Sequence, residues 1–165
     1  MRFIPRVTAL VVAVVALGLP AAADDAAPSE GEIDATFTWS AIDVATAPAP
    51  LEGTTSLVEA HLVVTSNVGG LFDRLAGTCL LQGLSHAQDW KATGSCALKD
   101  ADGDFLFESI TEEGEQGQAV LAGGTGKFAG ITGAHGYTTT WYASIREGEN
   151  QGIGVKKGHW KRPAM

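Results

Sequence analysis

The segment Gly123-Gly-Thr-Gly-Lys-Phe-Ala-Gly-Ile-Thr-Gly133, followed by Tyr137-Thr-Thr-Thr-Trp-Tyr142, decides the fold class of this chain. Glycine adopts backbone conformations that other residues avoid, so the first part predicts a tight loop. The β-branched and aromatic residues of the second part predict a strand soon after it. We expect the loop to be architectural, with Phe128 and Ile131 packed into the core. The glycines that shape it are Gly123, Gly124, Gly126, Gly130 and Gly133.

The same glycines match two nucleotide-binding patterns only loosely. Gly124-Thr-Gly-Lys-Phe-Ala129 fits a dinucleotide fingerprint, but that motif joins a strand to a helix, and no helix fits before the strand that follows. A phosphate-binding loop would need glycine at Leu121 and serine or threonine at Phe128. The sequence therefore indicates no nucleotide site, and we predict no cofactor.

Residues 32–165 predict an all-β domain. Short runs rich in Thr, Val, Ile and aromatic residues alternate with Gly, Pro, Asp and Asn clusters, and no long window repeats apolar residues with helical spacing. Asp102-Gly103 is the strongest hairpin signal, because a type I′ turn needs positive φ at both central residues. The predicted strands are 33–44, 56–66, 75–84, 90–98, 105–111, 118–122, 136–145 and 152–161.

Eight consecutive strands joined by short turns are typical of an antiparallel meander. Closing the meander into a single eight-stranded antiparallel barrel would remove the exposed strand edges on which chains aggregate. The 21 glycines, many of them at strand ends, allow the tight coiling of a small barrel. An open two-sheet sandwich is the alternative architecture.

The first residues have the composition of a secretory signal peptide. Arg2 and Arg6 precede the apolar run 8–19, and Ala21-Ala-Ala23 supplies small residues for cleavage. The run is short for a membrane span, which needs about 20 residues, although an uncleaved anchor is the alternative. We predict a signal peptide over 1–23, a flexible leader over 24–31, and a secreted domain, periplasmic or extracellular, that does not insert into the membrane after cleavage.

The two cysteines, Cys79 and Cys96, are seventeen positions apart and each lies within a predicted strand. In an oxidising compartment such a pair predicts a disulfide, which would also fix the register of the two strands. A reactive thiol or a metal pair is the weaker alternative, because neither cysteine has a nearby histidine or a Cys-x-x-Cys partner.

The charge of the chain excludes one class of partner. Its formal net charge is −8, and Lys156-Lys157 and Lys161-Arg162 are the only concentrations of basic residues after the first six positions. Nucleic acids and anionic membranes bind to basic surfaces, so we predict neither as a partner.

No metal site is predicted. The four histidines lie far apart and lack the spacing of metal ligands. Asp100-Ala-Asp-Gly-Asp104 has the composition of a calcium loop, but an EF-hand places its glycine sixth and between helices. We expect a solvated turn there, with a weak calcium site as the alternative. The histidines are His61, His86, His135 and His159.

One acid–base pair and six aromatic residues are candidates for a site. Glu59 and His61 share one face of the strand 56–66 and become catalytic candidates if that face lines a polar lumen. The opposite face is more apolar, which favours an outward orientation of the pair. The aromatic residues would form either the core or the wall of a ligand pocket. They are Phe37, Trp39, Trp90, Phe105, Phe107 and Trp141.

Residues 123–133 and the strand after them resemble the loop before a late strand in the allene oxide cyclase and dirigent proteins, and in secreted bacterial relatives of unassigned role. In the bacterial relatives, the resemblance includes a cysteine-bearing strand and an Asp-Ala-Asp-Gly-Asp turn. It implies an eight-stranded barrel of the calycin or allene oxide cyclase-like type. It implies no active-site residues, because none of the acids and arginines of those families has a local motif here.

Three functions are compatible with these observations. We expect a secreted barrel that binds a small apolar or amphipathic molecule without changing it, since no catalytic motif is present. The first alternative is a cofactor-independent cyclase or isomerase of allene oxide cyclase or dirigent type, which orients a reactive substrate and requires a buried ionisable group in the lumen. The second is a partner-binding scaffold whose interior is filled by side chains.

Overall fold

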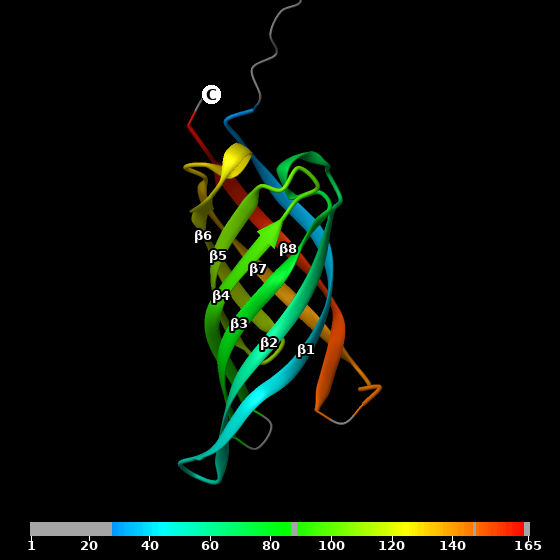
Figure 1. Ribbon diagram of the computed structural model, residues 1–165, viewed down its shortest axis with the longest axis vertical. Coiled ribbons are helices and arrows are strands. Elements are labelled where there is room, and N and C mark those ends of the chain that lie inside the picture. The colour runs from blue at the N-terminus through cyan, green and yellow to red at the C-terminus, as the bar shows by residue number, and fades with distance from the viewer. Residues whose placement is uncertain (1–27, 87–88, 147, 164–165) are drawn as a thin grey trace, which may run out of the picture.

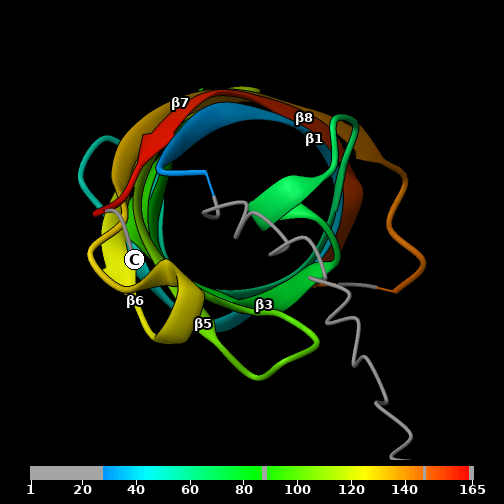
Figure 2. The same cartoon turned by 90° about the horizontal axis from the view of Figure 1, so that it is seen from above.

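Eight strands form one closed antiparallel barrel in which each strand pairs with the next and β8 pairs with β1 (Figure 1). The computed structural model describes residues 28–86, 89–146 and 148–163, so the predicted signal peptide and residues 24–27 lie outside it. Figure 2 shows the ring of strands from above. The barrel confirms the predicted architecture and excludes the open sandwich. The strands are β1 (Glu30–Ala49), β2 (Gly53–Ser66), β3 (Leu75–His86), β4 (Asp89–Lys99), β5 (Phe105–Glu113), β6 (Gln116–Gly124), β7 (Thr132–Tyr142) and β8 (Glu149–Lys161).

One end of the barrel is closed by an apolar plug. Two short 3₁₀ helices, η1 (Gly70–Phe72) and η2 (Gly126–Phe128), lie in the loops at this end, where the described chain also begins and ends (Figure 1). Their phenylalanines are fully buried and pack with inward-facing aliphatic residues of the strands. The plug leaves the opposite end of the lumen free for a site. Its large, fully buried members include Phe72, Leu75, Leu98, Leu106, Phe128 and Ile131.

The glycine-rich loop carries Phe128 and Ile131 into the plug. Gly126 has a φ of 49°, a left-handed conformation that glycine adopts without strain. At Gly124 a side chain would collide with the backbone of Phe105 and the Cβ of Phe128, so only glycine lets the loop approach this closely. The loop is therefore architectural, and it lies next to the acidic turn between β4 and β5.

Lys127 connects the glycine-rich loop to that acidic turn. Its ammonium contacts the carboxylates of Asp100 and Asp102, and its backbone N–H donates to Asp104. The ammonium thus lies where a cation bound by the turn would have to lie. Among the described residues, no group of three or more His, Cys, Asp or Glu is arranged to hold a metal ion.

Several strand boundaries differ from the predicted ones, and strand pairing explains the two largest shifts. β1 continues past residue 44 to Ala49, because it pairs with β2 along this extension although its pairing with β8 ends at Ile42. Pro48 is tolerated there, since one edge of the extension has no partner strand. β7 begins at Thr132 rather than 136, because Gly133 and Ala134 pair directly with β8. β1 itself begins at Glu30, two residues before the predicted start of the domain.

Candidate functional site

A cavity of about 250 Å³ occupies the half of the barrel away from the plug. Asp43, Ser85 and Asn150 line it near the strand ends, while Glu108 and Lys156 lie at its inner end. Two inward-facing glycines make room for aromatic rings beside this space: a side chain at Gly83 would collide with the ring of Trp90, and one at Gly154 with the ring of Phe37. The lumen is therefore hollow, and aromatic rings lie against its wall.

Four of the six predicted aromatic residues line the cavity. They are Phe37, Trp39, Trp90 and Trp141. Trp39 and Trp141 pack edge to face, with ring centroids 4.7 Å apart. The Trp39 Nε1–H is buried and has no hydrogen-bond partner among the described residues. An indole nitrogen can only donate, so the wall offers an unused donor to an acceptor within the cavity.

Phe105 and Phe107 are not part of the cavity, and their prediction as ligand-binding residues is corrected. The inward positions of β5 are Leu106, Glu108 and the alternate residues that follow, so both phenylalanines project from the outer wall. Their rings stack on each other, with centroids 6.1 Å apart.

Glu59 and His61 also lie on the outer wall, opposite the lumen. The Glu59 carboxylate is 3.1 Å from His61 Nε2, and 59% of the His61 side chain is exposed. Val58 and Ala60 occupy the inward positions of β2. The alternation of inward and outward residues along β2 therefore places the pair outside the barrel. The prediction of Glu59 and His61 as a lumenal acid–base pair is corrected.

A buried group of three polar residues lies at the inner end of the cavity. Glu108 of β5 accepts a hydrogen bond from His135 Nε2 of β7 at 3.0 Å, and its other oxygen is 3.4 Å from Lys156 Nζ of β8. All three side chains are buried. The sequence carried one signal for Glu108, which shares its strand face with Leu106 and Ile110. Nothing in the sequence indicated its two partners.

Burial and the two neighbouring side chains determine the charge of Glu108. Burial alone would raise the pKa of Glu108, but the charge of Lys156 and the contact with His135 outweigh burial and lower that pKa to about 2. A pKa below that of the unfolded chain stabilises the fold at neutral pH. The stabilisation is lost as the pH falls from the ordinary carboxyl pKa toward the folded-state value.

We expect the free energy of unfolding to decrease between about pH 5 and about pH 2, because Glu108 takes up its proton more readily in the unfolded chain. Urea unfolding across this range measures the slope. The same series on the Glu108→Gln variant should give a shallower slope, since that variant has no proton to bind. Equal slopes in the two proteins would contradict the assignment to Glu108.

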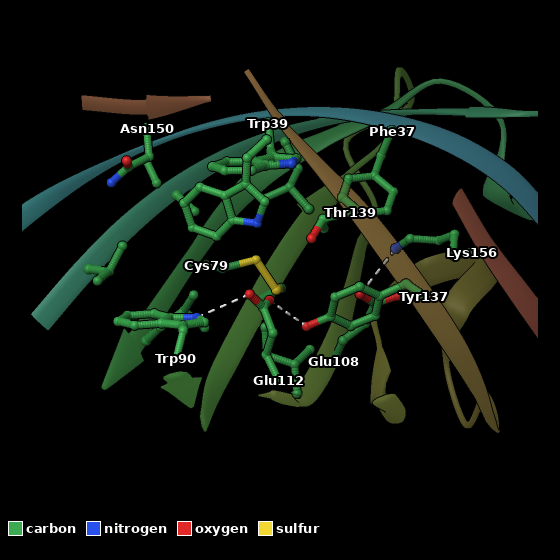
Figure 3. Close-up of a pocket in the computed structure, with 18 of the residues that line it drawn as sticks. Phe37, Trp39, Cys79, Trp90, Glu108, Glu112, Tyr137, Thr139, Asn150 and Lys156 are labelled. Atoms are coloured by element: carbon green, nitrogen blue, oxygen red, sulfur yellow. Dashed lines mark hydrogen bonds and ion pairs between the residues drawn. A yellow bond between two sulfur atoms is a disulfide. The ribbon is translucent and has the colours of Figure 1, made fainter. Parts of the chain in front are cut away.

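Glu112 forms a second polar centre on the cavity wall, nearer its open end. Figure 3 shows its carboxylate between Trp90 and Tyr137. Trp90 Nε1 donates to one oxygen at 3.1 Å, and the Tyr137 hydroxyl donates to the other at 2.9 Å. Burial raises the pKa of Glu112 despite these hydrogen bonds. Burial and the nearby Glu112 carboxylate raise the pKa of Tyr137, so its hydroxyl keeps its proton as a donor.

The predicted disulfide is confirmed and forms part of the cavity wall. Cys79 of β3 and Cys96 of β4 lie directly opposite each other in the register of the two strands. Both face the lumen. The bond thus ties together two neighbouring strands next to the cavity.

No family model and no curated protein matches the chain. The fold is similar to that of two solved pterocarpan synthase dirigent proteins. GePTS1 is 14% identical with a TM-score of 0.48, over 84% of this chain and 90% of that one. PsPTS1 is 14% identical with a TM-score of 0.46, over 82% of this chain and 97% of that one. Neither likeness bears on function, and the architecture rests on the strand pairing described above.

Proposed function

We propose that this protein binds one small apolar or amphipathic molecule inside its barrel. The observation that carries the proposal is the cavity of about 250 Å³, which is walled by aromatic rings and has a few polar groups directed into it. Such a composition is typical of small-molecule sites, where apolar surface gives affinity and polar groups fix orientation. The hypothesis of a partner-binding scaffold was based on an interior filled by side chains. The hollow lumen does not support that hypothesis.

Ligand binding should change the intrinsic fluorescence of the protein, because three of its four tryptophans line the cavity. Titration with a panel of lipids, phenols and other small amphipathic molecules tests this. Ala60→Leu narrows the cavity and should weaken the response, whereas Ala76→Leu on the outer wall of β3 should not alter it. Flat titrations across the panel would contradict the proposal.

A cofactor-independent cyclase or isomerase is the second candidate, and the Glu112–Tyr137 pair favours it. A carboxylate and a phenol 2.9 Å apart on the cavity wall form a pair that can accept and return a proton. Addition of the protein to allene oxides or to coupling phenols should then change the enantiomer ratio of the product. Glu112→Gln and Tyr137→Phe should reduce the effect. Unchanged ratios with every substrate would leave binding as the function.

We also propose that the protein is exported. The N-terminal pattern supports this, and so does the disulfide, because such bonds persist in oxidising compartments. Edman sequencing of protein recovered from the periplasm or medium of an expression host should begin at residue 24. A product retained in the cytoplasm with residue 1 intact would contradict export.

A further inference from the structure

The Glu112 carboxylate lacks a positive partner. Its two hydrogen-bond donors, Trp90 and Tyr137, are both neutral. Among the described residues, no Lys, Arg or His nitrogen lies within 4.0 Å of it, although the carboxylates of Glu108 and Glu113 both have such partners. Glu112 is half-buried, and carboxylates withdrawn from water are normally paired with a positive group. Each carboxylate oxygen accepts more than one hydrogen bond, so Glu112 can still accept from a ligand.

Another carboxylate of the lumen, Glu108, has the ammonium partner that Glu112 lacks. The Lys156 ammonium lies 3.4 Å from the Glu108 carboxylate and 5.5 Å from the centroid of the Phe37 ring. A carboxylate and an aromatic face thus already hold one ammonium group at the inner end. Glu112 presents a carboxylate without an ammonium, and Trp90 and Tyr137 donate to it from the edges of their rings.

The charges of the residues that line the cavity also favour a positively charged ligand. Lys156 is the one lysine or arginine among the described residues that line it, and Glu108 already pairs with this lysine. Asp43 adds a further carboxylate near the open end. An anionic ligand would therefore meet carboxylates without a free cation to receive it. The net charge of −8 also attracts cations to the protein.

We propose, on the basis of the ligand-binding function above, that the ligand is an amphipathic organic cation. Its protonated amine pairs with Glu112 between Trp90 and Tyr137, and its apolar body lies against the aromatic wall formed by Phe37, Trp39 and Trp141. The unused Trp39 N–H can donate to an acceptor on the same ligand.

Three probes of similar size and different charge test the inference. They are 2-phenylethylamine, 2-phenylethanol and 3-phenylpropionate, titrated into the whole protein at neutral pH with tryptophan fluorescence as the readout. We expect the amine to bind at least about ten-fold tighter than the alcohol, and the carboxylate to bind weakest. This ranking uses the unaltered protein and does not depend on the folding of a variant.

A matched pair of variants assigns the preference to one carboxylate. Glu112→Gln should bind the amine and the alcohol about equally, with alcohol affinity unchanged. Glu113→Gln, the same change on the outer wall next in sequence, should behave as wild type. Equal binding of amine and alcohol by the wild type, tighter binding of the carboxylate, or no amine binding would overturn the inference. Binding of any neutral panel member would leave the proposed function standing, and only flat titrations throughout would remove both.

Discussion

Lys156→Met should lower the free energy of unfolding by about 3–5 kcal/mol, because it leaves the Glu108 charge buried without its ammonium partner. Both side chains are almost completely buried, and their charged atoms are 3.4 Å apart. The stem of methionine fills the space of the lysine stem, so the loss arises mainly from charge. Equilibrium unfolding in urea at neutral pH, followed by circular dichroism, measures the change.

Two further variants separate this electrostatic effect from packing. Glu108→Gln combined with Lys156→Met removes both charges and keeps an acceptor for His135, so it should recover most of the lost stability. Lys157→Met alters the neighbouring exposed lysine, whose pair with Asp34 lies on the surface, and should cost less than about 1 kcal/mol. If Lys156→Met were as stable as Lys157→Met, the buried pair would contribute nothing measurable.

The barrel could be predicted because its determinants are local. Alternating residues, turn glycines and the loop around Phe128 each report on a few neighbouring positions, and together they give eight strands in order. Boundaries were less predictable where pairing with a distant strand decides them. β7 begins four residues early because β8 offers partners to Gly133 and Ala134, and no pattern near residue 132 reports on β8.

The site was predicted only in part, since a site in a barrel is assembled from several strands. Phe37, Trp39, Trp90 and Trp141 could be proposed because aromatic side chains suit a lumen wall. Glu108, His135 and Lys156 come from three strands, and their proximity depends on how the meander closes.

Alternation within a single strand could have separated true from false candidates. In β5 the inward set includes Glu108 and Glu112, which places Phe105 and Phe107 outside. In β2 the apolar set Val58 and Ala60 likewise places Glu59 outside. An acidic residue on the apolar face of a strand is thus a better signal for a lumenal group than an acid–base pair on the polar face.

Replacing both cysteines, as Cys79→Ala and Cys96→Ala, should lower the free energy of unfolding by about 3 kcal/mol, the chain-entropy estimate for a loop of this length. The bond joins directly opposite residues of β3 and β4, with a sequence separation of 17. Its loss frees the unfolded chain, whereas the folded barrel keeps its ladder of hydrogen bonds. Urea unfolding of the variant beside the oxidised wild type measures the difference.

Reduction provides the matched control for this pair. Dithiothreitol should destabilise the wild type by a similar amount and leave the double alanine variant unaffected, because only the wild type has a bond to break. Both sulfurs line the cavity, so the reduced protein also tests whether the wall keeps its shape without the bond. We expect it to retain ligand binding, since the aromatic rings and Glu112 project from strands that stay paired. A reduced wild type as stable as the oxidised one would show that strand pairing alone restrains this part of the barrel.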